Sequence, residues 1–143
     1  MMTENKIKIY LAGPVDNCTE KEQTIWRHVT KQAKPEYEYL DLMHYEVDVV
    51  RGKKTFAELI ELEKNDIYNC DVLLAWKPGS GTAMEIMYAY MLNMDQRRNN
   101  KINIVVVGEK NKYLSPWINH HATVVVSDFH EAFQWIDKNT NIT

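Results

Sequence analysis

The chain has 143 residues, which is enough for one domain with a sizeable core. Its composition, 45% hydrophobic and 26% charged, is that of an ordinary globular protein. The net charge is −3 at pH 7, and the basic clusters RGKK and QRRNNK are short and contain no aromatic residues. Because this pattern argues against nucleic-acid binding, we expect a single domain over residues 1–143 that binds no nucleic-acid polymer.

The cysteines and the apolar runs exclude further classes of protein. Cys18 and Cys70 form no CxxC or Cys/His pattern, so neither a metal site nor a disulfide framework is expected. The N-terminal MMTENK is unlike a signal peptide, and no apolar run reaches the length of a membrane span. We therefore expect a cytoplasmic protein with no metal and no membrane contact.

The first half of the chain predicts a strand, a helix and a second strand. Residues 6–13, KIKIYLAG, alternate and then become apolar before a Gly-Pro pair, as a buried strand does before a loop. A helical pattern starts at Thr19, which stands at capping-box spacing from Glu22, and ends before the next proline. Residues 37–42 predict a short strand, and residues 43–54 show no clear period and predict an irregular loop.

The second half of the chain predicts further alternation. Apolar residues at helical spacing predict a helix over TFAELIELEKNDIYNCD, directly before the strand DVLLAW at 71–76. A glycine-rich turn and an apolar helix over 80–94 follow. The remaining predicted elements are a strand at 102–108, a long loop containing SPWINHH, a strand at 122–126 and a helix from Ser127 to about Asn139.

This order of elements predicts the fold class and the place of a ligand. Strands alternate with helices, several strands are continuous apolar runs, and no Asn-Gly hairpin signal occurs, so we expect a parallel sheet with helices on both faces. Ligands of such sheets bind beyond the carboxyl ends of the strands, where the strand order reverses. The segments expected there are YLAGPV, AWKPGSGTAME and VGEKNKYLSPW.

A glycine-rich turn opens the helix after the strand at 71–76. Gly79, Ser80, Gly81 and Thr82 place free backbone N–H groups and a positive helix end there, which suits an anion or a sugar hydroxyl. No Walker lysine and no GxGxxG pattern is present, so ATP and dinucleotides are disfavoured. The alternative is that these glycines only terminate a loop.

Glu85 follows this turn and allows two interpretations. Thr82 and Glu85 stand three residues apart, which is the spacing of a capping box. Alternatively, Glu85 is a nucleophile: a carboxylate in the first turns of a helix is stabilised in its ionised form and would face the expected ligand crevice.

Other polar side chains are candidates for the same crevice. Glu63 and Asp66 are neighbours on one helical face, where one acid can raise the pKa of the other and supply a proton; the alternative is a solvated acidic face around Lys64. Tyr10, near the end of the first strand, either hydrogen-bonds a crevice carboxylate or packs in the core.

Two further groups are assigned structural roles. Met84, Met87, Met91 and Met94 fall at helical spacing and are expected in the core. His120 and His121 lack partners at metal-binding spacing and are expected to be loop or packing residues.

Four segments together resemble the nucleoside 2-deoxyribosyltransferase family, which also contains the 2'-deoxynucleoside 5'-monophosphate N-hydrolases. They are IYLAGPV, ELEKNDIYNCDVLLAW, PGSGTAMEIMYA and SPWINHHATVVV, and their order and spacing hold over nearly the whole chain. The resemblance implies an α/β fold, a flavodoxin-like three-layer sandwich with a five-stranded parallel sheet. It also implies an enzyme that needs no cofactor and cleaves the N-glycosidic bond of deoxynucleosides or deoxynucleotides.

The resemblance also implies roles for individual residues. Glu85 matches the family's nucleophile, Tyr10 matches the tyrosine that orients it, and Glu63 matches the acid that assists the departing base. The family usually has Asp at that acid position, so Asp66 is an alternative to Glu63. The segments Gly13–Pro14 and Gly79–Thr82 would contact the substrate.

Substrate choice and assembly stay open at this point. Gly79 occupies a position where the family's transferases tend to carry Asp and its N-hydrolases Ser. Our leading hypothesis is transfer of the sugar to a free base. Hydrolysis and a non-catalytic nucleotide sensor are the alternatives. The family completes its sites from a neighbouring subunit, here with candidates Ser115, Trp117 and Asn119. We therefore expect a homodimer or a larger homo-oligomer.

Overall fold

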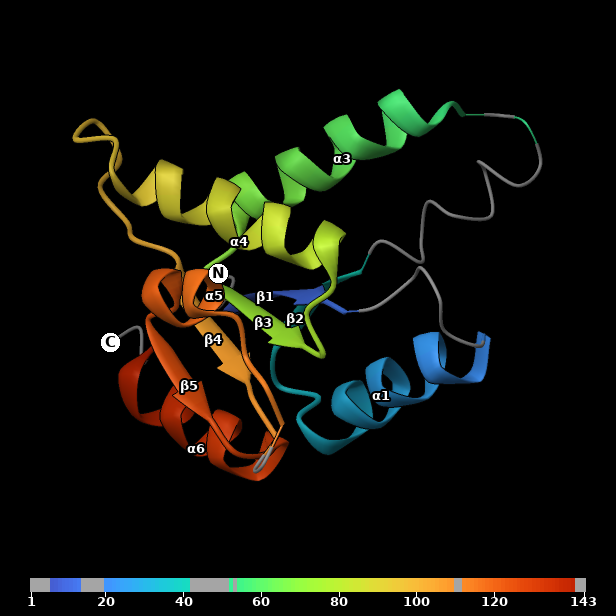
Figure 1. Cartoon of the computed structure of the whole chain (residues 1–143), viewed down its shortest axis with the longest axis vertical. Coiled ribbons are helices and arrows are strands. Elements are labelled where there is room, and N and C mark those ends of the chain that lie inside the picture. The colour runs from blue at the N-terminus through green and yellow to red at the C-terminus, as the bar shows by residue number, and fades with distance from the viewer. Residues whose placement is uncertain (1–5, 14–19, 42–51, 53, 110–111, 141–143) are drawn as a thin grey trace, which may run out of the picture.

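The computed structural model describes residues 6–13, 20–41, 52, 54–109 and 112–140. Within these residues helices and strands alternate almost throughout (Figure 1). The strands are β1 (Lys8–Ala12), β2 (Glu38–Asp41), β3 (Val72–Trp76), β4 (Asn103–Val107) and β5 (Val124–Val126), and the helices are α1 (Glu20–Ala33), α3 (Phe56–Asn69), α4 (Ser80–Asn93), α5 (Pro116–His121) and α6 (Phe129–Asn139).

The strands form one parallel sheet in the order β2-β1-β3-β4-β5. Tyr10 of β1 lies opposite Leu40 of β2 on one side and Leu73 of β3 on the other. The chain adds β2 on one side of β1 and β3 on the other, so the strand order reverses between β1 and β3. This confirms the predicted flavodoxin-like α/β fold and places the expected ligand crevice beyond the ends of these two strands.

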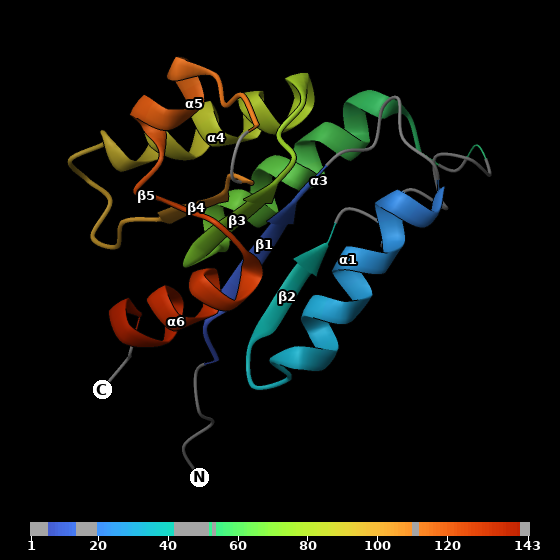
Figure 2. The same ribbon diagram turned by 60° about the horizontal axis from the view of Figure 1, so that its bottom comes forward.

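Two layers of helices cover the sheet. Helices α3, α4 and α5 lie on one face, and α1 and α6 lie on the other (Figures 1 and 2). Alternation along β1 divides its side chains between the faces: Tyr10 and Ala12 belong to the core under α3, α4 and α5, while Ile9 and Leu11 belong to the core with Trp26 of α1. Because the strands are apolar on both sides, the sheet has one hydrophobic core on each of its faces.

Several boundaries differ from the predictions. Residues 116–121, predicted as a loop, form the short helix α5, which begins at a Ser115 cap with Pro116 in the first turn. The start of α3 agrees with the prediction: Thr55 is its N-cap, and the Thr55 side chain forms a capping box with Glu58. The predicted cap Thr19 and most of the predicted loop 43–54 lie outside the described residues.

The prediction that the α4 methionines are core residues is wrong. Met84, Met91 and Met94 are exposed, and Met87 is only partly buried. The buried positions of α4 are Thr82, Ile86 and Ala89. Since α4 is apolar around its whole circumference, its sequence does not reveal which side faces the sheet. None of the described helices is both long and apolar enough to cross a lipid bilayer.

Candidate active site

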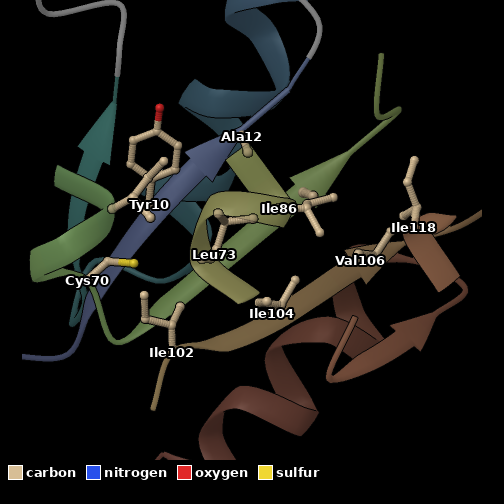
Figure 3. Close-up of a cluster of buried hydrophobic side chains, with 12 residues drawn as sticks. Tyr10, Ala12, Cys70, Leu73, Ile86, Ile102, Ile104, Val106 and Ile118 are labelled. Atoms are coloured by element: carbon tan, nitrogen blue, oxygen red, sulfur yellow. The ribbon is translucent and has the colours of Figure 1, made fainter. Parts of the chain in front are cut away.

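Tyr10 and Glu85 meet between the sheet and α4. The hydroxyl of Tyr10 donates a hydrogen bond to Oε2 of Glu85. Tyr10 is fully buried in the core that also contains Ile86, the residue after Glu85. Figure 3 shows the ring within this core and the hydroxyl oxygen directed away from the labelled aliphatic side chains. The strand alternation therefore aims the phenol at α4, and the helix presents Glu85 beside its buried face.

The start of α4 excludes the predicted capping box. Gly79 is the N-cap of α4, so Thr82 lies inside the helix and Glu85 lies in its second turn. Within the described chain, no side chain forms a capping hydrogen bond at this helix end. Ser80 and Gly81 are exposed, whereas Thr82 is buried. The N-terminal N–H groups are thus left for water or a ligand. Glu85 stands beyond the first turn, where the helix dipole acts most strongly.

Glu63 and Asp66 of α3 approach the same point. Both side chains are only partly exposed. Burial raises the pKa of the Tyr10 hydroxyl, and the negative charges of Glu85, Glu63 and Asp66 raise it further. Burial likewise raises the pKa of Glu63; Arg27 lowers it and Asp66 raises it. The charges of three carboxyl groups therefore act on one phenol, and Glu63 and Asp66 are partly buried rather than fully exposed on α3.

The charge state of Glu85 differs from the prediction. Burial raises the pKa of Glu85 to about 7; the hydrogen bond from Tyr10 and the charge of Arg27 lower it, and the charge of Glu63 raises it. The expected stabilisation of the ionised form by the start of the helix is therefore outweighed by burial. Glu85 is poised between its two protonation states near neutral pH.

Arg27 is a buried charged residue that the sequence analysis did not single out. It lies on α1, is 2% exposed, and pairs through Nε with Asp41 Oδ1 at 3.0 Å, at the carboxyl end of β2. Its charge acts on both Glu63 and Glu85. The only signal in the sequence is a charged residue on the apolar side of a helical pattern, next to Trp26.

Gly13, predicted to contact the substrate, lies against Trp26. A Cβ atom at Gly13 would lie 2.2 Å from Cζ2 of Trp26, so only glycine fits here. The Trp26 ring in turn packs at 5.4 Å from Trp76 and 5.8 Å from Phe129. The chain thus leaves β1 close to the aromatic side chains of the α1 face. Pro14 lies outside the described residues.

The turn between β3 and α4 contains a backbone conformation that is unusual outside glycine. Lys77 has a φ of 46°, in the left-handed region. Its ammonium group lies 4.6 Å from the centre of the Trp76 ring. Such conformations cost free energy and are often found where a turn is shaped for function.

The candidates after β4 lie on α5. Ser115 accepts a hydrogen bond from the backbone of Trp117 at 3.3 Å, Trp117 is 71% exposed, and Asn119 is exposed. Trp117 stacks on His121, which packs edge-on against Tyr90 of α4 at 4.5 Å. The contacts of these residues are therefore local to α5 and α4, and His121 is a packing residue as predicted.

Comparison with known proteins finds the same fold in several solved structures. No protein-family model and no curated protein sequence matches the chain. Among solved structures, a 2-deoxyribosyltransferase from Leishmania mexicana matches with a TM-score of 0.63 at 17% identity, covering 94% of this chain and 99% of that one. A 2-deoxyribosyltransferase from Bacillus psychrosaccharolyticus matches at 0.61 and 16%, covering 87% and 89%.

A third solved structure with this fold is an N-glycosidase. A CMP N-glycosidase from Clostridium botulinum matches with a TM-score of 0.51 at 15% identity, covering 91% of this chain and 98% of that one. At 15–17% sequence identity, these matches show a shared backbone fold. The protein has the fold of these deoxyribosyltransferases and of this N-glycosidase over nearly its whole length.

Proposed function

We propose that the protein is an enzyme that cleaves the N-glycosidic bond of a 2'-deoxynucleoside or its 5'-monophosphate and passes the sugar to a free base. The observation that carries the proposal is the hydrogen bond from the buried Tyr10 hydroxyl to Glu85, with Glu63 and Asp66 beside it. Retaining glycosyl transfer uses one carboxylate as nucleophile and a second carboxyl group as acid, and Tyr10 would hold the first of these in place. The shared fold with deoxyribosyltransferases supports the same reaction class.

In the first step Glu85 is the nucleophile. Its ionised carboxylate attacks the anomeric carbon, the bond from that carbon to the base nitrogen breaks, and the electron pair stays on the nitrogen. Glu63, or Asp66 in its place, donates the proton that neutralises the departing base. The product of this step is a deoxyribosyl ester of Glu85 and a free base.

In the second step an acceptor base attacks the same carbon from the vacated face. Its nitrogen bonds to the sugar, the ester bond breaks, and Glu85 leaves as a carboxylate. The deprotonated acid from the first step takes the proton from the acceptor. Because each step inverts the anomeric centre, the configuration is retained overall. With water as the acceptor, the same sequence is hydrolysis.

Tyr10 orients the nucleophile. Its hydrogen bond uses Oε2 of Glu85, so we assign the attack to Oε1. A phenol whose pKa is raised keeps its proton and therefore keeps donating to Glu85, which makes it a fixed orienting group. Positioning of a reacting group in this way supplies part of the rate enhancement. The free N–H groups at Ser80 and Gly81 are suited to the sugar or phosphate oxygens of the substrate.

The exposed side of α4 supports a homodimer with shared sites. Met84 and Met91 lie two helical turns apart on one side of α4 and are 72% and 58% exposed. An apolar patch of this kind is typical of an interface between subunits. Met84 is adjacent to Glu85, so a second copy packed on this patch would lie near the substrate, and we propose that its Trp117 or a neighbouring residue completes the site. Sedimentation of the wild type and of the double variant Met84→Glu/Met91→Glu tests the homodimer. We expect the wild type to sediment as a dimer and the double variant as a monomer. A wild type that is itself monomeric would contradict the proposal.

The test of the function is a matrix of substrates and acceptors. Purine and pyrimidine deoxynucleosides and their 5'-monophosphates are incubated with and without a different free base, and products are separated by chromatography. We expect a new deoxynucleoside that contains the added base, and no product with Glu85→Ala. Base release without an acceptor would show hydrolysis instead. Ligand-induced thermal stabilisation without any turnover would identify the protein as a nucleotide sensor.

A further inference from the structure

A groove on the side of the sheet away from α4 has the size of a ligand pocket. It lies between α1 and α6, which cover the same face of the sheet (Figure 2). Its volume is about 770 Å³, within the range of roughly 300–1,000 Å³ that is typical of small-molecule sites. Ile25 and Val29 of α1 line it and are 47% and 56% exposed. Concave apolar surfaces of this kind are typical of binding sites.

This α1–α6 groove is separate from the site around Glu85. It is lined by Trp26 of α1 and by Trp76 at the end of β3, and both belong to the core on the α1 side of the sheet. Tyr10, which donates to Glu85, belongs to the core on the opposite side. The sheet therefore stands between the groove and the Tyr10–Glu85 pair, and an occupant of the groove does not depend on the proposed reaction.

Aromatic side chains form the floor of the groove. Trp26 stacks on Phe129 at an angle of 26°, with ring centres 5.8 Å apart. Trp76 is tilted against both rings, at 5.4 Å from Trp26 and 6.0 Å from Phe129. Phe133 adds a fourth ring, and like Trp26 it is only 6% exposed. Rings that are packed against one another in this way present fixed flat faces and edges, which favour a flat aromatic ligand.

The charged side chains that line the groove are basic. They are Lys21, Lys34 and His130, and none of the described lining residues is acidic. Lys34 is paired with Asp137 at 2.8 Å, whereas Lys21 and His130 form no ion pair with any described residue. The other described lining residues are apolar or aromatic, apart from Thr30, which is 3% exposed. A single negative group on the ligand would therefore complement this lining.

We propose that the α1–α6 groove binds a small molecule that has a flat aromatic ring system and one negatively charged group. A protein partner fits less well, because eleven described residues line the groove and a stable protein interface takes about 20–30 residues on each side. A nucleotide also fits less well, because its sugar hydroxyls and base amides would be buried against apolar side chains without partners.

Two dyes with the same ring skeleton test the class of ligand. 8-Anilinonaphthalene-1-sulfonate carries one negative charge, and N-phenyl-1-naphthylamine lacks the sulfonate. Fluorescence titration at pH 7 should show saturable binding of one anionic dye per chain, at least about threefold tighter than the neutral dye. Lys21→Gln/His130→Gln should abolish this preference without weakening the neutral dye. Equal affinities of the two dyes for the wild type, or a preference that survives in the double variant, would overturn the proposal.

Ile25→Glu and Ile60→Glu are matched variants that locate the site. Both isoleucines are exposed on helices, at 47% and 52%, but Ile25 lines the groove and Ile60 lies on α3, on the other face of the sheet. Ile25→Glu should weaken both dyes about tenfold or more, because its carboxylate enters the apolar groove, and Ile60→Glu should weaken neither. If Ile25→Glu does not fold, Val29→Glu replaces it. Equal effects of the α1 and α3 variants, or no saturable binding, would overturn the proposal.

Competition separates the groove from the substrate site. Biphenyl-4-carboxylate should displace the anionic dye, and its uncharged amide should do so at least about threefold less well. Deoxynucleoside 5'-monophosphates should not displace it. Displacement by the monophosphates that is lost in Ile25→Glu would make the groove part of the substrate site and overturn the proposal. None of these measurements needs turnover, so a failure of the proposed function at Glu85 would leave their outcome unchanged.

Discussion

The hydroxyl of Tyr10 donates a hydrogen bond to the carboxylate of Glu85, 75 residues later in the chain. The contact joins the middle of β1 to the second turn of α4. Because both residues lie beside the reversal of strand order, the pair marks the part of the sheet where α/β proteins bind ligands.

Replacing Tyr10 with Phe should lower activity while the fold persists. The ring remains in the core, but the carboxylate of Glu85 loses a donor worth about 1.5–3 kcal/mol to a charged group, which corresponds to a loss of about 10- to 100-fold in kcat/KM. Since the hydrogen bond lowers the pKa of Glu85, the activity profile should also shift to higher pH. Single-turnover rates across pH check both effects.

Tyr39→Phe is the matched control for this change. Tyr39 donates to the Lys34 carbonyl at 2.7 Å, on the α1 side of the protein. It should leave both the rate and the pH profile unchanged. A Tyr10→Phe variant with a wild-type profile would show that the phenol does not act on Glu85.

Replacing Glu85 with Gln should stabilise the protein above neutral pH while it abolishes turnover. The pKa of Glu85 is raised from 4.5 to about 7 by burial in the folded state. Between these values the unfolded chain releases its proton first, so the wild type loses stability as pH rises. Gln has no such loss, and the variant should gain up to about 3 kcal/mol at pH 8 and nothing at pH 4.

Chemical denaturation at the two pH values measures this difference. Glu61→Gln is the control, because Glu61 is exposed on α3 and should show no comparable gain. A Glu85→Gln variant that is less stable than wild type at pH 8 would mean that the ionised carboxylate is favourably held, and would contradict the raised pKa.

The sheet and most of its helices could be predicted because their signals are local. Continuous apolar strands and helical periodicity give the order of elements without knowledge of the contacts between them. Helix α5 was missed because six residues are too few to establish a period, although Ser115 followed by Pro116 is a recognisable helix start. The exposed Met84 was misplaced because an apolar helix has no polar side to orient it.

The candidate site, like the fold, could be predicted only in part. Glu85 and Tyr10 could be proposed from the sequence because they stand in segments with a recognisable order, one in the first strand and the other in the helix after the glycine-rich turn. The burial of Arg27 could not be predicted, because it depends on the contact with Asp41 of β2, which only the assembled fold brings beside α1. The raised pKa of Glu85 was also missed, since burial is a property of the assembled fold.

Two glycine substitutions should have opposite effects on stability. Gly13→Ala places a Cβ 2.2 Å from the Trp26 ring, which is itself packed against other aromatic rings, so we expect a loss of about 1–3 kcal/mol. Gly81→Ala meets no atom within 4 Å in the first turn of α4 and should gain about 0.5–1 kcal/mol from helix propensity. Thermal unfolding compares them, and tryptophan fluorescence should change only in Gly13→Ala. Equal stabilities of the two variants would contradict the close contact between Gly13 and the Trp26 ring.

The choice between Glu63 and Asp66 as the acid can be made with a substrate that needs no acid. An N7-methylated purine deoxynucleoside carries a positive charge on its base, so the base departs without a proton. If Glu63 is the acid, Glu63→Gln should lose about 100-fold or more on the unmethylated substrate and much less on the methylated one, because only the former depends on proton donation.

Asp66→Asn provides the comparison on the same face of α3. We expect a smaller loss that is similar for the two substrates, since Asp66 then acts only through its charge on Glu63 and Tyr10. The reverse result, with methylation rescuing Asp66→Asn but not Glu63→Gln, would assign the proton to Asp66. Equal losses on both substrates in both variants would mean that neither carboxyl group protonates the base, and that the two acids hold the substrate or the fold instead.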